Sequence, residues 1–159
     1  MKWQTQTINK KFLRLLQDNY PNGVTNDKAY RLYYDECFTR IGKERIEQYY
    51  VQSGRITADE AYKWDTMMTM NVRNQLCTIA YHNILKRVQP GIYNWNPAYK
   101  DTEDFWRYVD SINQLVRLRR EERKALMLEA RIEAKRLTEE TGERVNSYEV
   151  FRRYMEEGR

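Results

Sequence analysis

The sequence predicts an all-α protein: a helical body of about four helices, one long projecting helix and a short C-terminal helix. Three observations support this fold class. Only 3 Pro and 6 Gly occur in 159 residues, too few for a loop-rich β protein. Apolar residues recur mainly at helical spacing. The stretch from Thr102 to about Glu140 contains neither Pro nor Gly and reads as one unbroken helix.

The front of the chain predicts two helices separated by a turn. An apolar stripe at helical spacing marks the first, short helix: Ile8, Phe12, Leu15 and Leu16. Pro21 and Gly23 follow it, and they indicate a turn because Pro cannot continue a helix and Gly accepts a positive φ. Thr25 is placed to cap the second helix, and Gly42 marks a kink or break in it.

A capping box predicts the start of the central core helix. In Thr57-Ala58-Asp59-Glu60, the Thr hydroxyl and the Glu carboxylate can each satisfy a free backbone N–H at the helix start. The apolar stripe that follows predicts a helix reaching about Val88. The next segment, Gln89–Lys100, contains two turn pairs and is predicted to be an aromatic loop.

The long helix has apolar residues on two sides when about 100° is advanced per residue. One stripe runs from Phe105 to Leu137, with arginines in its middle. The second stripe, nearly opposite, consists of Leu118, Ala125, Leu128 and Ile132. A last helix from Ser147 to about Glu157 can fold back over one side. The other side then needs a second subunit or another protein, because an exposed apolar stripe on a charged helix usually marks an interface. The alternative is that the front helices bury both stripes within one chain.

The predicted organisation is a single domain with two parts. Residues 1–118 form the helical body, which includes the aromatic loop at 89–100. Residues 119–159 form a projecting helical arm and the C-terminal helix. The body is expected to stop near Val116, because Arg119 and Arg123 would be costly in a dry core without partners.

The basic surplus lies in the front of the chain. The formal net charge is +5, and the first 100 residues hold 15 Lys and Arg against 9 Asp and Glu. Such a surplus favours a polyanionic partner. Nucleic-acid binding is therefore the alternative function, although no helix-turn-helix, zinc-finger or RNA-recognition signature is present. Its predicted contact residues are Lys28, Arg31, Arg40, Lys43, Arg45, Lys86, Arg87 and Lys100.

The sequence gives almost no indication of enzymatic chemistry. It has no glycine-rich phosphate loop, no GxSxG and no HExxH. His82 is the single histidine, and it cannot complete a four-ligand zinc site with Cys37 and Cys77. We therefore predict no catalytic residue, metal, cofactor or small-molecule substrate. No apolar run reaches the roughly 18 residues of a membrane span, and no signal peptide is seen, so an intracellular location is expected (the host cytoplasm if the protein is viral).

The first functional hypothesis is a non-enzymatic interaction protein that self-associates or docks onto a larger assembly, as a structural component or an inhibitor. A small chain rich in Lys, Asn and Tyr would suit a virus or a mobile element. The loop aromatics could equally fold back over helix ends. The predicted partner-binding residues are Leu118, Leu126, Leu128, Ile132 and Leu137 in the arm, with Tyr93 and Trp95 in the loop.

Overall fold

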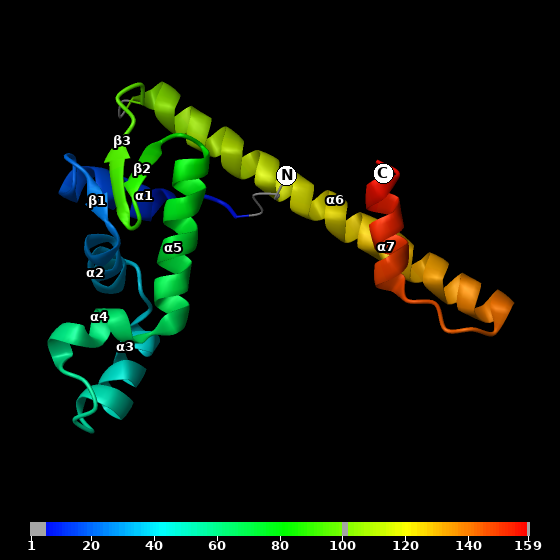
Figure 1. Ribbon diagram of the computed structural model, residues 1–159, viewed down its shortest axis with the longest axis horizontal. Helices are drawn as coiled ribbons and strands as arrows, with labels where there is room; N and C mark the ends of the chain where they lie inside the picture. The colour runs from blue at the N-terminus through cyan, green and yellow to red at the C-terminus, as the bar shows by residue number, and fades with distance from the viewer. Residues whose placement is uncertain (1–5, 100–101, 159) are drawn as a thin grey trace. The chain divides into compact units, whose positions relative to one another are not determined.

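The computed structural model describes residues 6–99 and 102–158 and shows a predominantly helical chain with a small three-stranded sheet (Figure 1). The described residues divide into two compact units, which we call the N-terminal unit (residues 6–113) and the C-terminal unit (residues 114–158). The long helix α6 (Glu103–Thr141) contributes residues to both. It confirms the unbroken helix predicted from about Thr102 to Glu140.

The N-terminal unit contains more and shorter helices than predicted. Its helical segments are α1 (Lys10–Asn19), α2 (Asn26–Glu36), α3 (Arg40–Ile46), the π-helical η1 (Glu47–Val51), the 3-10 helix η2 (Ala58–Glu60), α4 (Ala61–Trp64) and α5 (Thr66–Tyr81). Its strands are β1 (Val24–Thr25), β2 (Leu85–Gln89) and β3 (Ile92–Trp95), which form an antiparallel sheet in the order β1-β3-β2.

Two side-chain caps divide helices that were predicted to be continuous. The hydroxyl of Thr39 accepts from the Gly42 N–H at 3.1 Å and begins α3, so the break precedes Gly42. The carboxylate of Asp65 accepts from the Met68 N–H at 2.8 Å and begins α5. Thr57 makes no side-chain cap bond, so the predicted capping box is wrong.

The core helix α5 ends at Tyr81 and does not reach Val88 as predicted. Asn83 takes a left-handed conformation with φ 61°. The N–H of Ile84 donates to the C=O of Ile79, and the N–H of Asn83 donates to the C=O of Ala80. These two bonds form the Schellman motif, which turns the chain away from the helix axis. An apolar contact usually accompanies this motif, and the two residues at its ends, Ile79 and Ile84, are both fully buried in the core cluster.

The β2–β3 hairpin corrects both the all-α prediction and the predicted loop at 89–100. The hairpin turns at Pro90-Gly91, where Gly91 has φ +78°. The N–H of Asn26 donates to the C=O of Gly91 at 2.9 Å and ties the hairpin to the start of α2. A Cβ at Gly91 would lie 3.1 Å from the Asn26 side-chain nitrogen, so both the conformation and the close approach favour glycine there.

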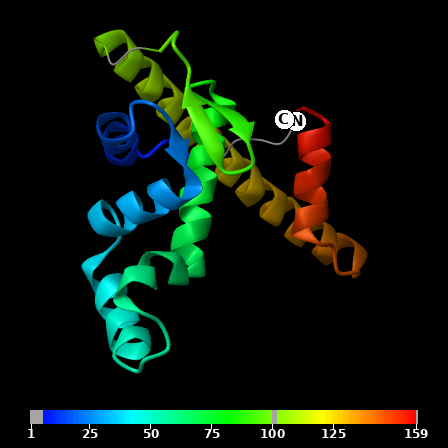
Figure 2. The same ribbon diagram turned by 60° about the vertical axis from the view of Figure 1, so that its left-hand side comes forward.

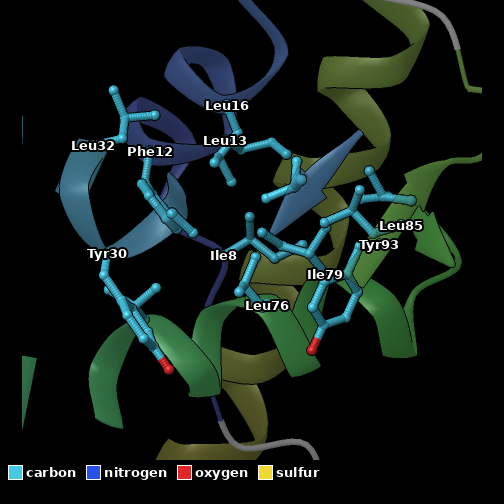
Figure 3. Close-up of a cluster of buried hydrophobic side chains, with 14 of the residues drawn as sticks. Ile8, Phe12, Leu13, Leu16, Tyr30, Leu32, Leu76, Ile79, Leu85 and Tyr93 are labelled. Carbon is cyan, nitrogen blue, oxygen red and sulfur yellow. The ribbon is translucent and has the colours of Figure 1, made fainter. Parts of the chain in front are cut away.

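The core of the N-terminal unit lies where α1, α2, α5, the front of α6 and the sheet meet. Figure 3 shows side chains from α1, α2, α5 and both hairpin strands converging on one another. Phe12 and Tyr33 make an edge-to-face ring contact at 5.3 Å within it. The side chains labelled in Figure 3 are all buried: Ile8, Phe12, Leu13, Leu16, Tyr30, Leu32, Leu76, Ile79, Leu85 and Tyr93.

Two buried amide side chains hold residues 7–9, the segment before α1. The Asn113 side chain accepts from the Ile8 N–H at 2.7 Å and donates to the Ile8 C=O at 3.0 Å. Gln75 accepts from the Asn9 N–H at 2.8 Å and donates to the Thr7 C=O at 2.9 Å. The two amides therefore satisfy this backbone as a neighbouring strand would, and they attach it to α5 and α6.

The C-terminal unit is built from the rear of α6 and from α7 (Ser147–Glu156), which cross obliquely in both ribbon views (Figures 1 and 2). Asn146 caps α7. The inner face of α7 carries Val150 and Tyr154, which are buried, and Phe151, which is partly buried. On α6, their contacts are the small side chains of Ala130 and Ala134, with Leu126 beside them.

A search of the described residues finds no helix with both the length and the apolar character needed to cross a membrane.

Candidate interaction surface

One face of α6 in the C-terminal unit exposes large aliphatic side chains. Leu118 is 54% exposed, Leu128 is 59% exposed and Ile132 is 64% exposed. Ala125 lies between them and is also exposed. We call these four residues the α6 stripe. At about 100° per residue, the stripe is centred roughly 155° from the face that α7 covers.

The structure divides the five arm residues that were predicted to bind a partner. Leu118, Leu128 and Ile132 share the exposed face, whereas Leu126 is partly buried against α7 and Leu137 is half-buried. α7 packs against the alanines of α6 because small side chains allow two helices to approach closely. The longer side chains of the stripe are left on the opposite face.

Charged residues of opposite sign border the α6 stripe. Arg117, Lys124 and Arg131 lie along one edge, and Glu122 and Glu129 lie along the other. Lys124 forms an ion pair with Glu121 at 3.1 Å. The other four edge residues, Arg117, Arg131, Glu122 and Glu129, form no ion pair within residues 6–99 and 102–158. These edge charges are not among the sequence-based predictions, although the seven-residue spacing of Leu118, Ala125 and Ile132 is the signal that identifies the edge positions.

A hollow of about 470 Å³ lies beside the stripe, between α6 and the end of α7. Ala125, Leu126 and Met155 form its apolar lining. Glu122 and Glu129 line it as well. The accessible apolar surface thus extends from the stripe toward the C-terminal end of α7.

The two aromatic residues predicted to bind a partner belong to β3 and not to a loop. Tyr93 is 5% exposed and packs in the core of the N-terminal unit, where burial raises the pKa of its hydroxyl. Trp95 is half-buried, and its Nε1 donates to the Tyr20 C=O at 2.6 Å. A partner cannot reach the Tyr93 ring in this fold, so Tyr93 is removed from the candidate surface.

The basic residues predicted to contact nucleic acid are spread over α2, α3 and β2, and Lys100 lies outside the described residues. Five of them have partners within the N-terminal unit: Lys28 with the Tyr20 ring, Arg31 with Tyr62, Arg40 with Glu44, Lys43 with the Asp35 C=O and Arg45 with Asp65. Lys86 and Arg87 are exposed on β2 and have no ion-pair partner in the part of the chain that the structure describes.

Arg31 belongs to a polar network between α2 and α4. The Tyr62 hydroxyl donates to Asp27 at 2.8 Å and accepts from Arg31 at 3.3 Å. The hydrogen bond from Tyr62 lowers the pKa of the Asp27 carboxyl below its ordinary value, and Lys63, 3.3 Å away, lowers it further against the opposing effect of burial. The guanidinium of Arg31 also stacks over the Tyr62 ring at 4.7 Å. This network gives Arg31 a structural role between α2 and α4 that requires no contact with a nucleic-acid phosphate.

His82 caps the end of α5 and provides a pH-dependent prediction. Its Nε2 is buried and has no hydrogen-bond partner among the described residues, and burial lowers the pKa of the imidazole. As the pH falls through the ordinary value of about 6.5, the unfolded chain binds a proton that the folded chain resists. The free energy of unfolding should therefore fall between about pH 7 and pH 5. Denaturant titrations should show a smaller fall for H82Q, and an equal fall would contradict this role.

Comparisons with known protein families, with curated proteins and with solved structures find no match for this chain. Its function must therefore be inferred from its own geometry.

Proposed function

We propose that the protein is a non-enzymatic interaction protein that self-associates or docks onto a larger assembly through the α6 stripe. One observation carries the proposal: three large aliphatic side chains are more than half exposed on one face of a helix whose opposite face already packs against α7. Burial of a leucine or isoleucine side chain is worth about 1.5–3 kcal/mol. Covering the stripe would therefore give a substantial driving force for association.

The surroundings of the stripe suit a protein partner. The apolar strip is narrow and has charged edges, as expected of a surface that contacts another helix. The adjoining hollow adds further apolar lining from Leu126 and Met155. A structural component or an inhibitor of a larger machine would use such a surface without carrying out chemistry.

Nucleic-acid binding by the front of the chain is the weaker alternative. Its best support is the exposed pair Lys86 and Arg87 on β2. The other described basic residues of that set contact side chains or carbonyls of their own unit. These residues are divided among α2, α3 and β2 and most are already engaged, which weakens the case for a phosphate-binding face.

The test replaces two members of the stripe with aspartate. L128D/I132D places two charges in the middle of the apolar face and should abolish association, because burying an unpaired carboxylate costs about 3–5 kcal/mol. I41D is a matched control, since Ile41 is 79% exposed and lies on α3. Sedimentation velocity measures self-association. A photo-crosslinking amino acid at position 128 or 41, introduced in the producing cells, measures docking onto other proteins.

The proposal expects L128D/I132D to abolish association and I41D to leave it unchanged. It likewise expects crosslinks from position 128 and none from position 41. It is contradicted by a monomeric chain that also forms no crosslink at position 128. It is equally contradicted if L128D/I132D associates as the wild type does.

A further inference from the structure

We infer that the occupant of the α6 stripe is a second copy of this chain, with the two α6 helices parallel and in register. This inference deepens the proposed function and rests on it. Its independent support is the arrangement of charges along the two edges of the stripe.

The stripe follows a seven-residue repeat. Leu118, Ala125 and Ile132 are spaced by seven and occupy the first core position (a) of a coiled-coil heptad. Leu128 then occupies the second core position (d), three residues after Ala125. In this frame α7 covers positions b, c and f through its contacts with Leu126, Ala130 and Ala134, which leaves positions a, d, e and g accessible. These are the four positions through which two helices pair in a coiled coil.

The edge charges distinguish between the two orientations. Position g holds Arg117, Lys124 and Arg131, and position e holds Glu122 and Glu129. In a parallel, in-register pair, each g residue faces the e residue five positions later in the other copy. Arg117 then meets Glu122, and Lys124 meets Glu129, once on each side of the seam. In an antiparallel pair, e faces e and g faces g, so carboxylates meet carboxylates and cations meet cations.

Three further charged residues lie at paired positions in this frame: Glu121 and Lys135 at d and Arg136 at e. Lys135 lies beyond Ile132, the last apolar core residue, and so marks the end of the seam. Glu121 occupies a d position, but its carboxylate already turns sideways to the Lys124 ammonium, 3.1 Å away. Arg131 would face Arg136 of the other copy, and Arg136 is already neutralised by Glu133 and Glu140, each at 2.6 Å. The seam covers only two heptads, so we expect a weak dimer that depends on protein concentration.

The first test exchanges the edge charges and uses sedimentation equilibrium. E122K/E129K turns the attractive charge pairs at the edges of the parallel seam, Arg117 with Glu122 and Lys124 with Glu129, into repulsive ones. It should raise the dissociation constant about tenfold or more. Combining it with R117E/K124E exchanges the two edges and should restore self-association. In an antiparallel pair E122K/E129K would only replace carboxylate repulsion with ammonium repulsion, so the dissociation constant would stay unchanged.

The second test measures orientation by disulfide formation. In a background of C37S/C77S, A125C places the new thiols opposite each other only in a parallel, in-register pair, because an antiparallel pair sets position 125 opposite a d position. We expect A125C to form a disulfide-linked dimer under mild oxidation. R120C, at position c on the far side of the seam, is the control and should remain monomeric under the same conditions.

The outcomes separate this inference from the proposed function. The inference is overturned if E122K/E129K associates like the wild type or if A125C crosslinks no better than R120C. If L128D/I132D still abolishes association or crosslinking in that case, the interaction function stands with a different partner or orientation. If L128D/I132D has no effect either, both fail.

Discussion

Replacement of Asn113 with leucine should lower the free energy of unfolding by about 2–6 kcal/mol, because two backbone groups lose their partners at about 1–3 kcal/mol each. Asn113 is 4% exposed and Ile8 is 2% exposed, so water cannot readily replace the lost amide. The N–H and C=O of Ile8 are both held by Asn113. Leucine has a similar size, so the loss reports hydrogen bonding more than packing. Denaturant titration gives the loss, and hydrogen exchange at the Ile8 amide locates it.

Two variants make the Asn113 experiment specific. Q114L changes the adjacent exposed residue and should leave stability within about 0.5 kcal/mol of the wild type, as expected for a surface substitution. N113D keeps the acceptor for the Ile8 N–H but places an oxygen against the Ile8 C=O, so it should also be destabilising. An N113L protein as stable as Q114L would show that residues 7–9 are not held by this amide.

Replacement of Val150 with aspartate should detach α7 from α6. Val150 is 4% exposed and packs with Ala130, Ala134 and Tyr154. An aspartate there would bury an unpaired charge at a cost of about 3–5 kcal/mol. The small cluster of Ala130, Ala134, Val150 and Tyr154 is too limited to offset that cost. Amide hydrogen exchange over residues 147–156 should therefore rise to the rate of an unstructured peptide.

R152D is the matched control for V150D. It introduces the same side chain two positions away, on the exposed side of α7. Exchange over residues 147–156 should stay slow in R152D. If the amides of residues 147–156 exchange as slowly in V150D as in R152D, the contacts of Val150 with Ala130, Ala134 and Tyr154 do not hold α7 in place.

The elements predicted well from the sequence are those whose signals are local. The long helix was predictable because no Pro or Gly interrupts Thr102–Glu140. α7 was predictable because Gly142 ends the preceding helix and an apolar triplet follows at helical spacing. The exposed α6 stripe also follows from angular position along a regular helix, which needs no long-range information.

The sheet and the end of α5 depend on contacts that no local pattern reveals. β1 has two residues, and its partners Ile92 and Tyr93 lie far along the sequence. Asn83 looks like an ordinary polar helix residue, yet it takes the left-handed conformation that turns the chain into β2. Local patterns consequently predict a loop around Tyr93 and a ring available to a partner, whereas its strand carries the ring into the core.

The α7-facing alanines and the α6 stripe impose different demands on a single helix. Positions 130 and 134 are limited by volume, since any larger side chain would push α7 away. Positions 118, 128 and 132 have room for many shapes but not for charge. Along the rear of α6, substitutions on the face under α7 should therefore be limited by side-chain size. Substitutions on the opposite face, half a turn away, should be limited by charge.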